Sequence, residues 1–161
     1  MSCECPVITL SPRDYDAVLF DLDGVLTKTA RIHALAWKKL FDRFLEQRST
    51  EMGEPFVPFD FDADYRRYVD GKPRYDGVTD FLLSRGVELP HGTSEDGPEA
   101  PTIRGLGNLK DQYFLEHLKQ HGVESYEAAI GLVQTLRAQE MKTAVVSSSN
   151  NCAEVLEAAV I

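Results

Sequence analysis

Cysteine and long apolar runs are scarce in this 161-residue sequence. Its three cysteines are an odd number without the spacing of a disulfide framework, which argues against a disulfide-stapled secreted domain. No apolar run approaches the roughly 20 residues that a membrane-spanning helix needs. The N-terminus also lacks a basic region followed by an apolar stretch, which a secretion signal would have. We therefore expect a soluble, reduced, cytoplasmic protein that does not associate with a membrane.

Basic residues are also in the minority. Lys and Arg total 17 against 26 Asp and Glu, which gives a net charge of −9 at pH 7. Because phosphate backbones are held by Lys and Arg, this balance argues against a general nucleic-acid-binding surface. It remains compatible with a small phosphorylated substrate, which a local cation and a few side chains can hold.

The N-terminal segment 1–13 is polar and contains two prolines, so we expect a tail or an edge element. Cys3-Glu4-Cys5 has the chemistry of a metal-ligand pair. Closed zinc sites need about four ligands, however, and no further cysteine or nearby histidine supplies them. An unstructured tip is the favoured interpretation.

Two short apolar runs are typical of strands in a parallel sheet. Residues 17–20 lead into Asp21, and residues 143–146 lead into a segment rich in Ser and Asn. Continuous apolar runs predict strands that are buried on both faces. Residues 125–140 predict an amphipathic helix with Ser125 as its N-cap. A helix followed by a strand with polar residues at its carboxyl end indicates a Rossmann-like, doubly wound α/β sheet.

A helical insertion separates the two runs. The spacing of apolar residues predicts helices over residues 32–47, 76–85 and 108–121, the last two followed by the C-cap glycines Gly86 and Gly122. Residues 90–101 are a loop by composition. The predicted domains are therefore 1–30 with 122–161 for the α/β core and 31–121 for an inserted helical cap.

The last residues, Ala-Ala-Val-Ile, form the end of an apolar stretch without a helix-capping residue. Two parallel strands alone also cannot cover their own faces and edges. We expect the chain to be the N-terminal part of a longer polypeptide, with the C-terminal part of the core and additional domains outside it.

Asp21 and Asp23 follow the first strand two positions apart, so strand periodicity places both carboxylates on one side. Two close carboxylates repel each other unless a cation intervenes, and Mg²⁺ held by one or two carboxylates and by phosphate oxygens resolves that repulsion. One aspartate can then attack phosphorus and form an aspartyl-phosphate, while the other donates a proton to the leaving oxygen.

Ser147 ends the second strand, directly before a helix that Asn150 or Asn151 can cap. A hydroxyl and free N–H groups at a helix N-terminus hold phosphate oxygens. The carboxyl ends of parallel strands share one edge of a sheet, so the two strand ends supply complementary halves of one site. A second acidic run, Asp60 to Asp64, lacks the spacing of a calcium loop and is interpreted as a solvated loop.

Residues 18–27 resemble the first signature of the haloacid dehalogenase superfamily of phosphotransferases, with its apolar strand, paired aspartates, glycine and threonine. Residues 145–150 are similar to the second signature, a strand that ends in Ser or Thr. The helical insertion resembles the mobile cap of the β-phosphoglucomutase-like branch, because Thr29, His33 and Trp37 follow at that branch's spacing.

The resemblance implies a role for each matching residue. Asp21 would be the nucleophile and a Mg²⁺ ligand, and Asp23 the general acid and base, with its backbone carbonyl also on the metal. His33 would bridge cap and core, and Arg74 would bind the distal phosphate of the substrate. The remaining implied phosphate- and substrate-binding residues are Ser147, Ser148, Ser149, Asn151, Gly71 and Lys110. As purely structural residues, His33 would be a helix-surface histidine and Arg74 an exposed loop charge.

The implied activity is Mg²⁺-dependent phosphoryl transfer on a small sugar phosphate, as a phosphomutase of the β-phosphoglucomutase type. The alternatives are a sugar-phosphate phosphatase, for example of the trehalose-phosphate type, and a non-catalytic module that binds phosphate or a partner. The superfamily's third and fourth signatures, a lysine and an acidic pair that completes the metal site, have no match in this sequence. We therefore expect the 161-residue chain alone to be inactive or nearly so.

Overall fold

The computed structural model describes residues 9–159, so Cys3 and Cys5, with the expected unstructured tip, lie outside the described residues. The chain divides into two compact units, Met1–Lys28 with Val123–Ile161 and Thr29–Gly122. We call them the strand unit and the helical unit. The sequence predicts these boundaries at residues 30 and 122. None of the helices in the described part is long and apolar enough to cross a membrane.

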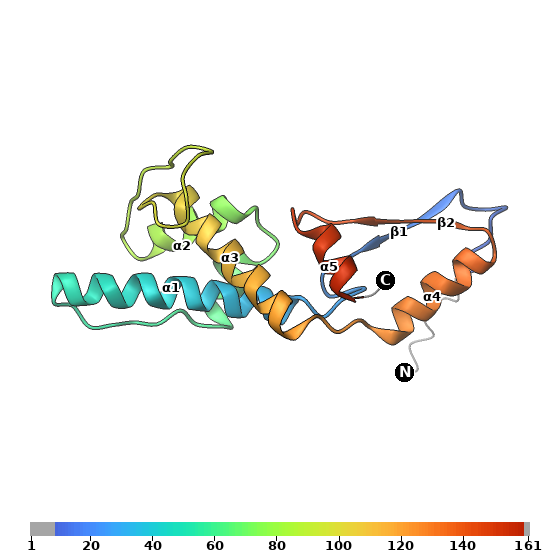
Figure 1. Ribbon diagram of the computed structural model, residues 1–161, viewed down its shortest axis with the longest axis horizontal. Helices are drawn as coiled ribbons and strands as arrows, with labels where there is room; N and C mark the ends of the chain where they lie inside the picture. Colours follow the sequence, from blue (N-terminus) through green and yellow to red (C-terminus); the bar gives the residue numbers. More distant parts are fainter. Residues whose placement is uncertain (1–8, 160–161) are drawn as a thin grey trace, which may run out of the picture. The chain divides into compact units, whose positions relative to one another are not determined.

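The strand unit contains the two predicted strands (Figure 1). β1 (Ala17–Asp21) and β2 (Lys142–Val146) pair in parallel, with Asp21 opposite Val146 at their carboxyl ends. Two helices accompany the pair, α4 (Glu127–Ala138) before β2 and α5 (Cys152–Ala159) after it. The order helix, strand, helix is the connection that a parallel α/β sheet requires.

The prediction that both strands are buried on both faces is wrong for the described residues. Phe20 is 8% exposed, whereas its neighbour Leu19 is 65% exposed, and Val146 is 57% exposed. Successive side chains of a strand point to opposite faces. One face of the two-stranded sheet therefore packs against other described residues, and the face with Leu19 and Val146 does not.

α4 begins later than the sequence predicts, because Ser125 is not its N-cap. The backbone of Ser125 pairs with that of Thr27, and the N–H of Tyr126 donates to the carbonyl of Leu26 at 2.9 Å. These extended contacts keep residues 125 and 126 out of the helix, whose first residue is Glu127.

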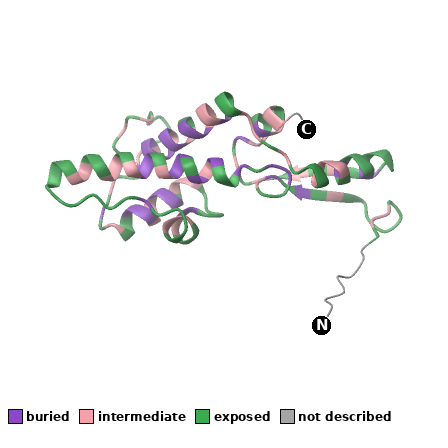
Figure 2. Ribbon diagram, turned by 90° about the horizontal axis from the view of Figure 1, so that it is seen from below, coloured by how far each residue is buried: buried purple, intermediate pink, exposed green. Residues whose placement is uncertain are grey.

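The helical unit contains α1 (Ala30–Met52), a short π-helix η1 (Tyr65–Val69), α2 (Arg74–Ser84) and α3 (Ile103–His121). α3 packs against both α1 and α2, and the buried residues of the unit gather on the facing sides of these helices (Figure 2). Its largest fully buried side chains are Phe41, Phe59, Phe81 and Phe114. Residues 90–101 lie outside any helix or strand, as predicted.

The helix ends follow their caps. α1 continues to Met52, and its C-cap Gly53 has a φ of 68°. α3 begins at Ile103, five residues before the predicted start, because the Thr102 hydroxyl accepts a hydrogen bond from the N–H of Gly105 at 3.0 Å. An N-cap of this kind satisfies a backbone donor that the first turn leaves open. Gly122 is the C-cap of α3, as predicted.

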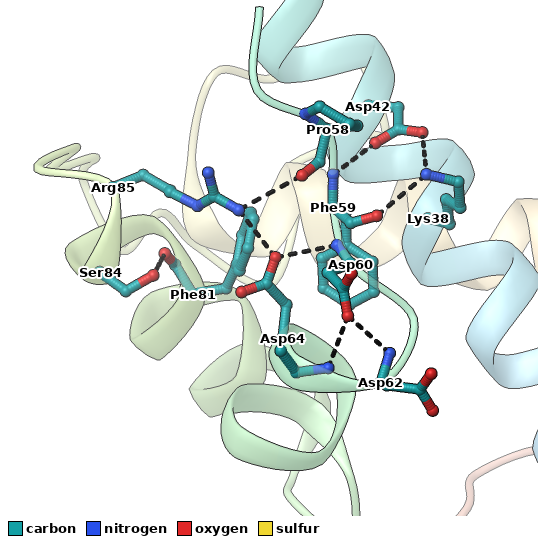
Figure 3. Close-up of polar contacts among 11 residues, drawn as sticks. Lys38, Asp42, Pro58, Phe59, Asp60, Asp62, Asp64, Phe81, Ser84 and Arg85 are labelled. Carbon is teal, nitrogen blue, oxygen red and sulfur yellow. Dashed lines mark hydrogen bonds and ion pairs between the residues drawn. The ribbon is translucent and has the colours of Figure 1, made fainter.

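The connection from α1 to η1 is fixed at Phe59, whose side chain is 1% exposed (Figure 3). Asp42 accepts a hydrogen bond from the N–H of Phe59 at 2.7 Å, and the Lys38 ammonium donates to its carbonyl at 2.9 Å. Lys38 and Asp42 also pair with each other at 2.7 Å along α1. Both backbone groups and the side chain of Phe59 are therefore held by the helical unit.

The acidic run after Phe59 is exposed from Asp60 to Ala63, as expected for a solvated loop, but Asp64 at its end is not. The Asp64 carboxylate pairs with the Arg85 guanidinium at 2.7 Å, and their side chains are 15% and 22% exposed (Figure 3). Asp64 also accepts the N–H of Asp60 at 2.9 Å, and Asp60 accepts the N–H groups of Asp62 and Ala63. This acidic run closes a turn that starts the η1 segment, and Arg85 at the end of α2 neutralises part of its charge.

Candidate active site

The loop after β1 turns the two aspartates away from the core. Leu22 is fully buried, and its carbonyl accepts the N–H and the hydroxyl of Thr27 at 3.0 and 3.2 Å. Gly24 has a φ of 80°, in the left-handed region that favours glycine, and its N–H donates to the carbonyl of Thr27 at 2.8 Å. With Leu22 inside, Asp21 is exposed and Asp23 is half-buried.

The segment after β2 is organised by its own hydroxyls. The Ser147 hydroxyl accepts the N–H of Ser149 at 3.0 Å, and the Ser149 hydroxyl accepts the N–H of Asn151 at 3.2 Å. Asn151 directly precedes α5 and is 6% exposed. Ser148 is exposed. Short side-chain-to-backbone bonds of this type hold a loop open at a helix N-terminus, where phosphate oxygens bind.

The two strand ends meet as the parallel pairing requires. The hydroxyl oxygen of Ser147 lies 3.5 Å from the Asp23 carboxylate, although 124 positions separate them in the sequence. Asp21 lies beside them in the ladder, opposite Val146. The strand unit thus brings two carboxylates and a hydroxyl to one edge of the sheet, which is where open α/β sheets bind ligands.

Cys152 belongs to this edge, although the sequence pattern does not mark it. Burial raises the pKa of its thiol above the ordinary value, and the negative charges of Asp23 and Glu154 add to the increase. The thiol is therefore kept protonated near neutral pH, which makes it a weak nucleophile. The sequence alone does not single out Cys152, because Asp23, whose charge acts on its thiol, lies in another part of the chain.

In the helical unit, His33 and Lys110 lie together. The Lys110 ammonium is 2.8 Å from Nδ1 of His33, and the His33 ring stacks on Phe114 with 4.2 Å between ring centroids. Lys110 is 4% exposed and lies 5.1 Å from the ring centres of both Trp37 and Phe114. His33 is therefore not an isolated helix-surface histidine, and the two predicted substrate-binding residues form one aromatic-lined cluster.

Arg74 is not an exposed loop charge. It is the first residue of α2, and its guanidinium pairs with the Asp111 carboxylate of α3 at 2.6 Å. The two side chains are 18% and 22% exposed. Gly71, earlier in the same loop, has a φ of 66° and open space where a side chain would begin. Asp111 is a residue that the sequence analysis missed.

Comparison with known proteins identifies the family. A sequence profile described as haloacid dehalogenase-like hydrolase matches residues 15–159. The chain belongs to this family. The structure and the profile together confirm the haloacid dehalogenase-like α/β fold that the sequence predicts.

Curated relatives of this chain include a β-phosphoglucomutase from Mycobacterium tuberculosis, which is 46% identical over 145 residues. That match covers 90% of this chain and 55% of the relative, so the chain spans about half the length of that relative. An uncharacterised glycosyl hydrolase from Mycobacterium tuberculosis is 39% identical over 153 residues, which are 95% of this chain and 11% of that protein.

Solved structures show the same fold. A haloacid dehalogenase hydrolase from Entamoeba histolytica has a TM-score of 0.64 at 18% identity, covering 91% of this chain and 56% of its own. A β-phosphoglucomutase from Clostridium difficile has a TM-score of 0.60 at 21% identity, covering 88% of this chain and 55% of its own. Both comparisons support the fold of this chain and not its substrate.

The donor atoms at the end of β1 suit Mg²⁺. Asp21 and Asp23 offer hard carboxylate oxygens on the solvent-facing side of a buried leucine. Within residues 9–159, no group of three or more His, Cys, Asp or Glu side chains gathers into a metal cluster. Mg²⁺ is commonly held by one or two carboxylates, with water and substrate phosphate completing its shell, so two aspartates fit this ion.

Proposed function

We propose that this chain carries the nucleophile and the phosphate-binding serine of a Mg²⁺-dependent phosphoryl transferase that acts on a small sugar phosphate. The observation that carries the proposal is the 3.5 Å approach of the Ser147 hydroxyl to the Asp23 carboxylate, beside Asp21 at the strand ends. The 46% identity to a β-phosphoglucomutase supports a phosphomutase in particular. The low cysteine content is consistent with a cytoplasmic location.

In the proposed reaction, a carboxylate oxygen of Asp21 forms a bond to phosphorus while the bond from phosphorus to the sugar oxygen breaks. Asp23 gives its proton to the departing sugar oxygen and later takes one from the next attacking hydroxyl. The Ser147 hydroxyl and the nearby exposed Ser148 bind oxygens of the phosphoryl group. The Asp21 carboxylate and the Asp23 backbone carbonyl would hold Mg²⁺, which would shield the negative charge of the phosphate from the nucleophile and leave the Asp23 carboxyl group for proton transfer.

The other predicted substrate-binding residues are proposed to hold the sugar and its second phosphate. Ser149 and Asn151 follow the phosphate-binding serine in the strand unit. His33, Gly71, Arg74 and Lys110 belong to the helical unit, where a guanidinium suits bidentate binding of phosphate.

A phosphatase is the second candidate function, and the glycosyl hydrolase relative bears on the size of the protein that would carry it. The chain corresponds to 11% of that relative at 39% identity, so a related sequence forms a small part of a long polypeptide. The length of that relative is compatible with a multi-domain protein, and a phosphatase of that kind would act on a disaccharide phosphate, for example of the trehalose-phosphate type.

Turnover of β-glucose 1-phosphate tests the proposal on the protein expressed with any sequence that its reading frame adds after Ile161. Glucose 6-phosphate formation is followed in a coupled assay with a glucose bisphosphate as primer, and free phosphate is measured in parallel. We expect Mg²⁺-dependent glucose 6-phosphate formation and at least a 1,000-fold loss in Asp21→Asn, because the amide is a far poorer nucleophile than the carboxylate.

The matched control is Asp16→Asn, which neutralises an exposed carboxylate just before β1 and should keep full activity. Phosphate release without isomerisation would replace the mutase by the phosphatase. Wild-type activity in Asp21→Asn, or no turnover by the unmutated protein, would contradict phosphoryl transfer at this site.

A further inference from the structure

The ion pair between Arg74 and Asp111 is short and largely buried, like the pair between Arg85 and Asp64 and unlike the exposed ion pairs of the helical unit. Its atoms are 2.6 Å apart, and both side chains are about four-fifths buried, at 18% and 22% exposed. By comparison, the pair between Lys39 on α1 and Glu116 on α3 is 3.8 Å long with side chains 60% and 44% exposed. A short, largely buried Arg–carboxylate pair restrains its arginine, whereas an exposed pair of long side chains does so weakly.

One turn of α3 supplies the residues that contact Arg74 and its neighbour Tyr75. The Tyr75 hydroxyl donates to the Asn108 side-chain oxygen at 2.9 Å, one turn before Asp111. At Gly107, a Cβ would lie 2.6 Å from the Tyr75 ring and 3.4 Å from Cδ of Arg74, so the absence of a side chain allows α2 this close to α3. The Arg74–Asp111 ion pair, the Tyr75–Asn108 hydrogen bond and the close approach of Tyr75 to Gly107 therefore fix the N-terminus of α2 and the aliphatic part of Arg74.

We propose that Asp111 is a positioning residue for substrate binding: it holds the Arg74 guanidinium in the orientation that receives the second phosphate of a sugar phosphate. This inference rests on the proposed function of Arg74. A guanidinium has five N–H donors, and the hydrogen bond to Asp111 comes from Nη2 of Arg74, so donors on the other nitrogens can bind a phosphate. Holding the side chain before the substrate arrives removes part of the conformational entropy that binding would otherwise cost.

The positioning role predicts a specific pattern of steady-state constants. Measured with β-glucose 1-phosphate on the protein with its full reading frame, Asp111→Ala should raise KM by about tenfold with little change in kcat, which corresponds to the loss of one charged hydrogen bond. Asp111→Asn keeps an acceptor oxygen and should recover part of the loss. Arg74→Ala should raise KM at least as much as Asp111→Ala.

The double variant separates positioning from a general loss of packing. If Asp111 acts through Arg74, the change of Asp111→Ala has little further effect on KM once Arg74 is alanine. The matched control is Glu116→Gln, which removes an α3 carboxylate from an exposed ion pair and should leave KM unchanged. Circular dichroism and thermal unfolding of each variant check that α2 and α3 are still folded.

Three results would overturn the inference. Asp111→Ala could raise KM by the same factor with and without Arg74, which would make its role independent of the guanidinium. It could lower KM, which would make Asp111 a competitor of the phosphate. Arg74→Ala could leave KM unchanged while Asp21→Asn is inactive, in which case the phosphoryl-transfer proposal stands and this inference falls. A wild-type protein without turnover would instead remove the proposed function itself, and this inference with it.

Discussion

At the scale of single residues, the ionisation of the Cys152 thiol depends on the charge of the candidate active site. Its thiol pKa is raised by burial first and then by the carboxylates of Asp23 and Glu154. A thiol reacts with alkylating reagents as the thiolate, so its rate of alkylation follows its ionisation. The reaction of Cys152 therefore measures the negative charge near Asp23 without any need for turnover.

The first prediction concerns the pH profile of this alkylation. In a chain whose other two cysteines, Cys3 and Cys5, are serine, iodoacetamide should modify Cys152 with a rate that rises at higher pH than for an unperturbed thiol. Asp23→Asn removes a negative charge that disfavours the thiolate, so the rise should move to lower pH. The rates are measured by mass spectrometry of the intact chain.

Asp16→Asn is the control, because it removes one carboxylate from the same unit at an exposed position before β1. If both variants had the same profile as the parent, the negative charge of Asp23 would not reach the thiol. The shared edge of Asp23 and the α5 N-terminus would then be contradicted.

Some residues of the candidate site could be predicted from the sequence, and others are recognised only in the structure. Asp21, Asp23 and Ser147 follow apolar runs, and the rule that parallel strands end at one edge is sufficient to expect Ser147 near the aspartates. No sequence pattern marks Asp111, because its role depends on its contact with Arg74, which lies 37 positions away on another helix. Whether a charged residue is a ligand, a partner or a solvated group depends on packing that spacing alone does not encode.

At the scale of elements, the α-helices were predictable, their ends were less so, and the short π-helix η1 was not predicted. The apolar spacing places the start of the third helix of the insertion near residue 108, and the preceding Gly105 and Gly107 are poor helix formers. The structure uses both glycines for close contacts. A Cβ at Gly105 would lie 2.1 Å from the carbonyl oxygen of Ala100, and one at Gly107 would meet the Tyr75 ring. Tertiary packing therefore overrides the local propensity.

The second prediction concerns the segment between α1 and η1, which depends on Phe59. Its ring is 1% exposed and lies 5.3 Å from the centre of the Phe41 ring and 5.1 Å from that of Phe81. Phe59→Ala should lower the free energy of unfolding of the helical unit by about 3–5 kcal/mol, from lost burial and the cavity left behind. Urea unfolding followed by the fluorescence of Trp37, the single tryptophan, measures this loss.

Phe61 supplies the control, because it is the same residue type two positions later and is 41% exposed. Phe61→Ala should change the free energy of unfolding by no more than about 0.5 kcal/mol. Equal losses in the two variants would mean that the segment is not anchored at Phe59, and the network of Lys38, Asp42 and Phe59 would lose its structural role.

At the scale of the whole molecule, the uncovered face of the two-stranded sheet bears on whether copies of the chain associate in solution. The expectation of strands buried on both faces rested on the continuous apolar runs, and those runs do carry apolar residues on both sides. What the runs cannot encode is whether other residues cover each side. In the described residues, Leu19 and Val146 are 65% and 57% exposed, and Ala17 and Ala144 on the same face are exposed as well.

The third prediction is that this face causes the 161-residue chain to self-associate. Adjacent exposed apolar side chains on a sheet with open edges favour association between copies. Leu19→Thr with Val146→Thr keeps β-branched or strand-compatible residues in both strands and removes apolar surface. We expect the dissociation constant of the self-associated form, measured by sedimentation equilibrium, to rise by about tenfold.

The control pair removes the same two residue types from the helical unit, as Leu83→Thr with Val57→Thr, whose wild-type side chains are 52% and 55% exposed. Because these two residues lie outside the sheet, their replacement should leave the dissociation constant within about twofold of the parent value. If the control pair weakened association as much as the strand pair, general surface hydrophobicity would account for it. A fully monomeric parent chain would show that an apolar sheet face of this size is tolerated in water, and that its two strands need no cover to remain paired.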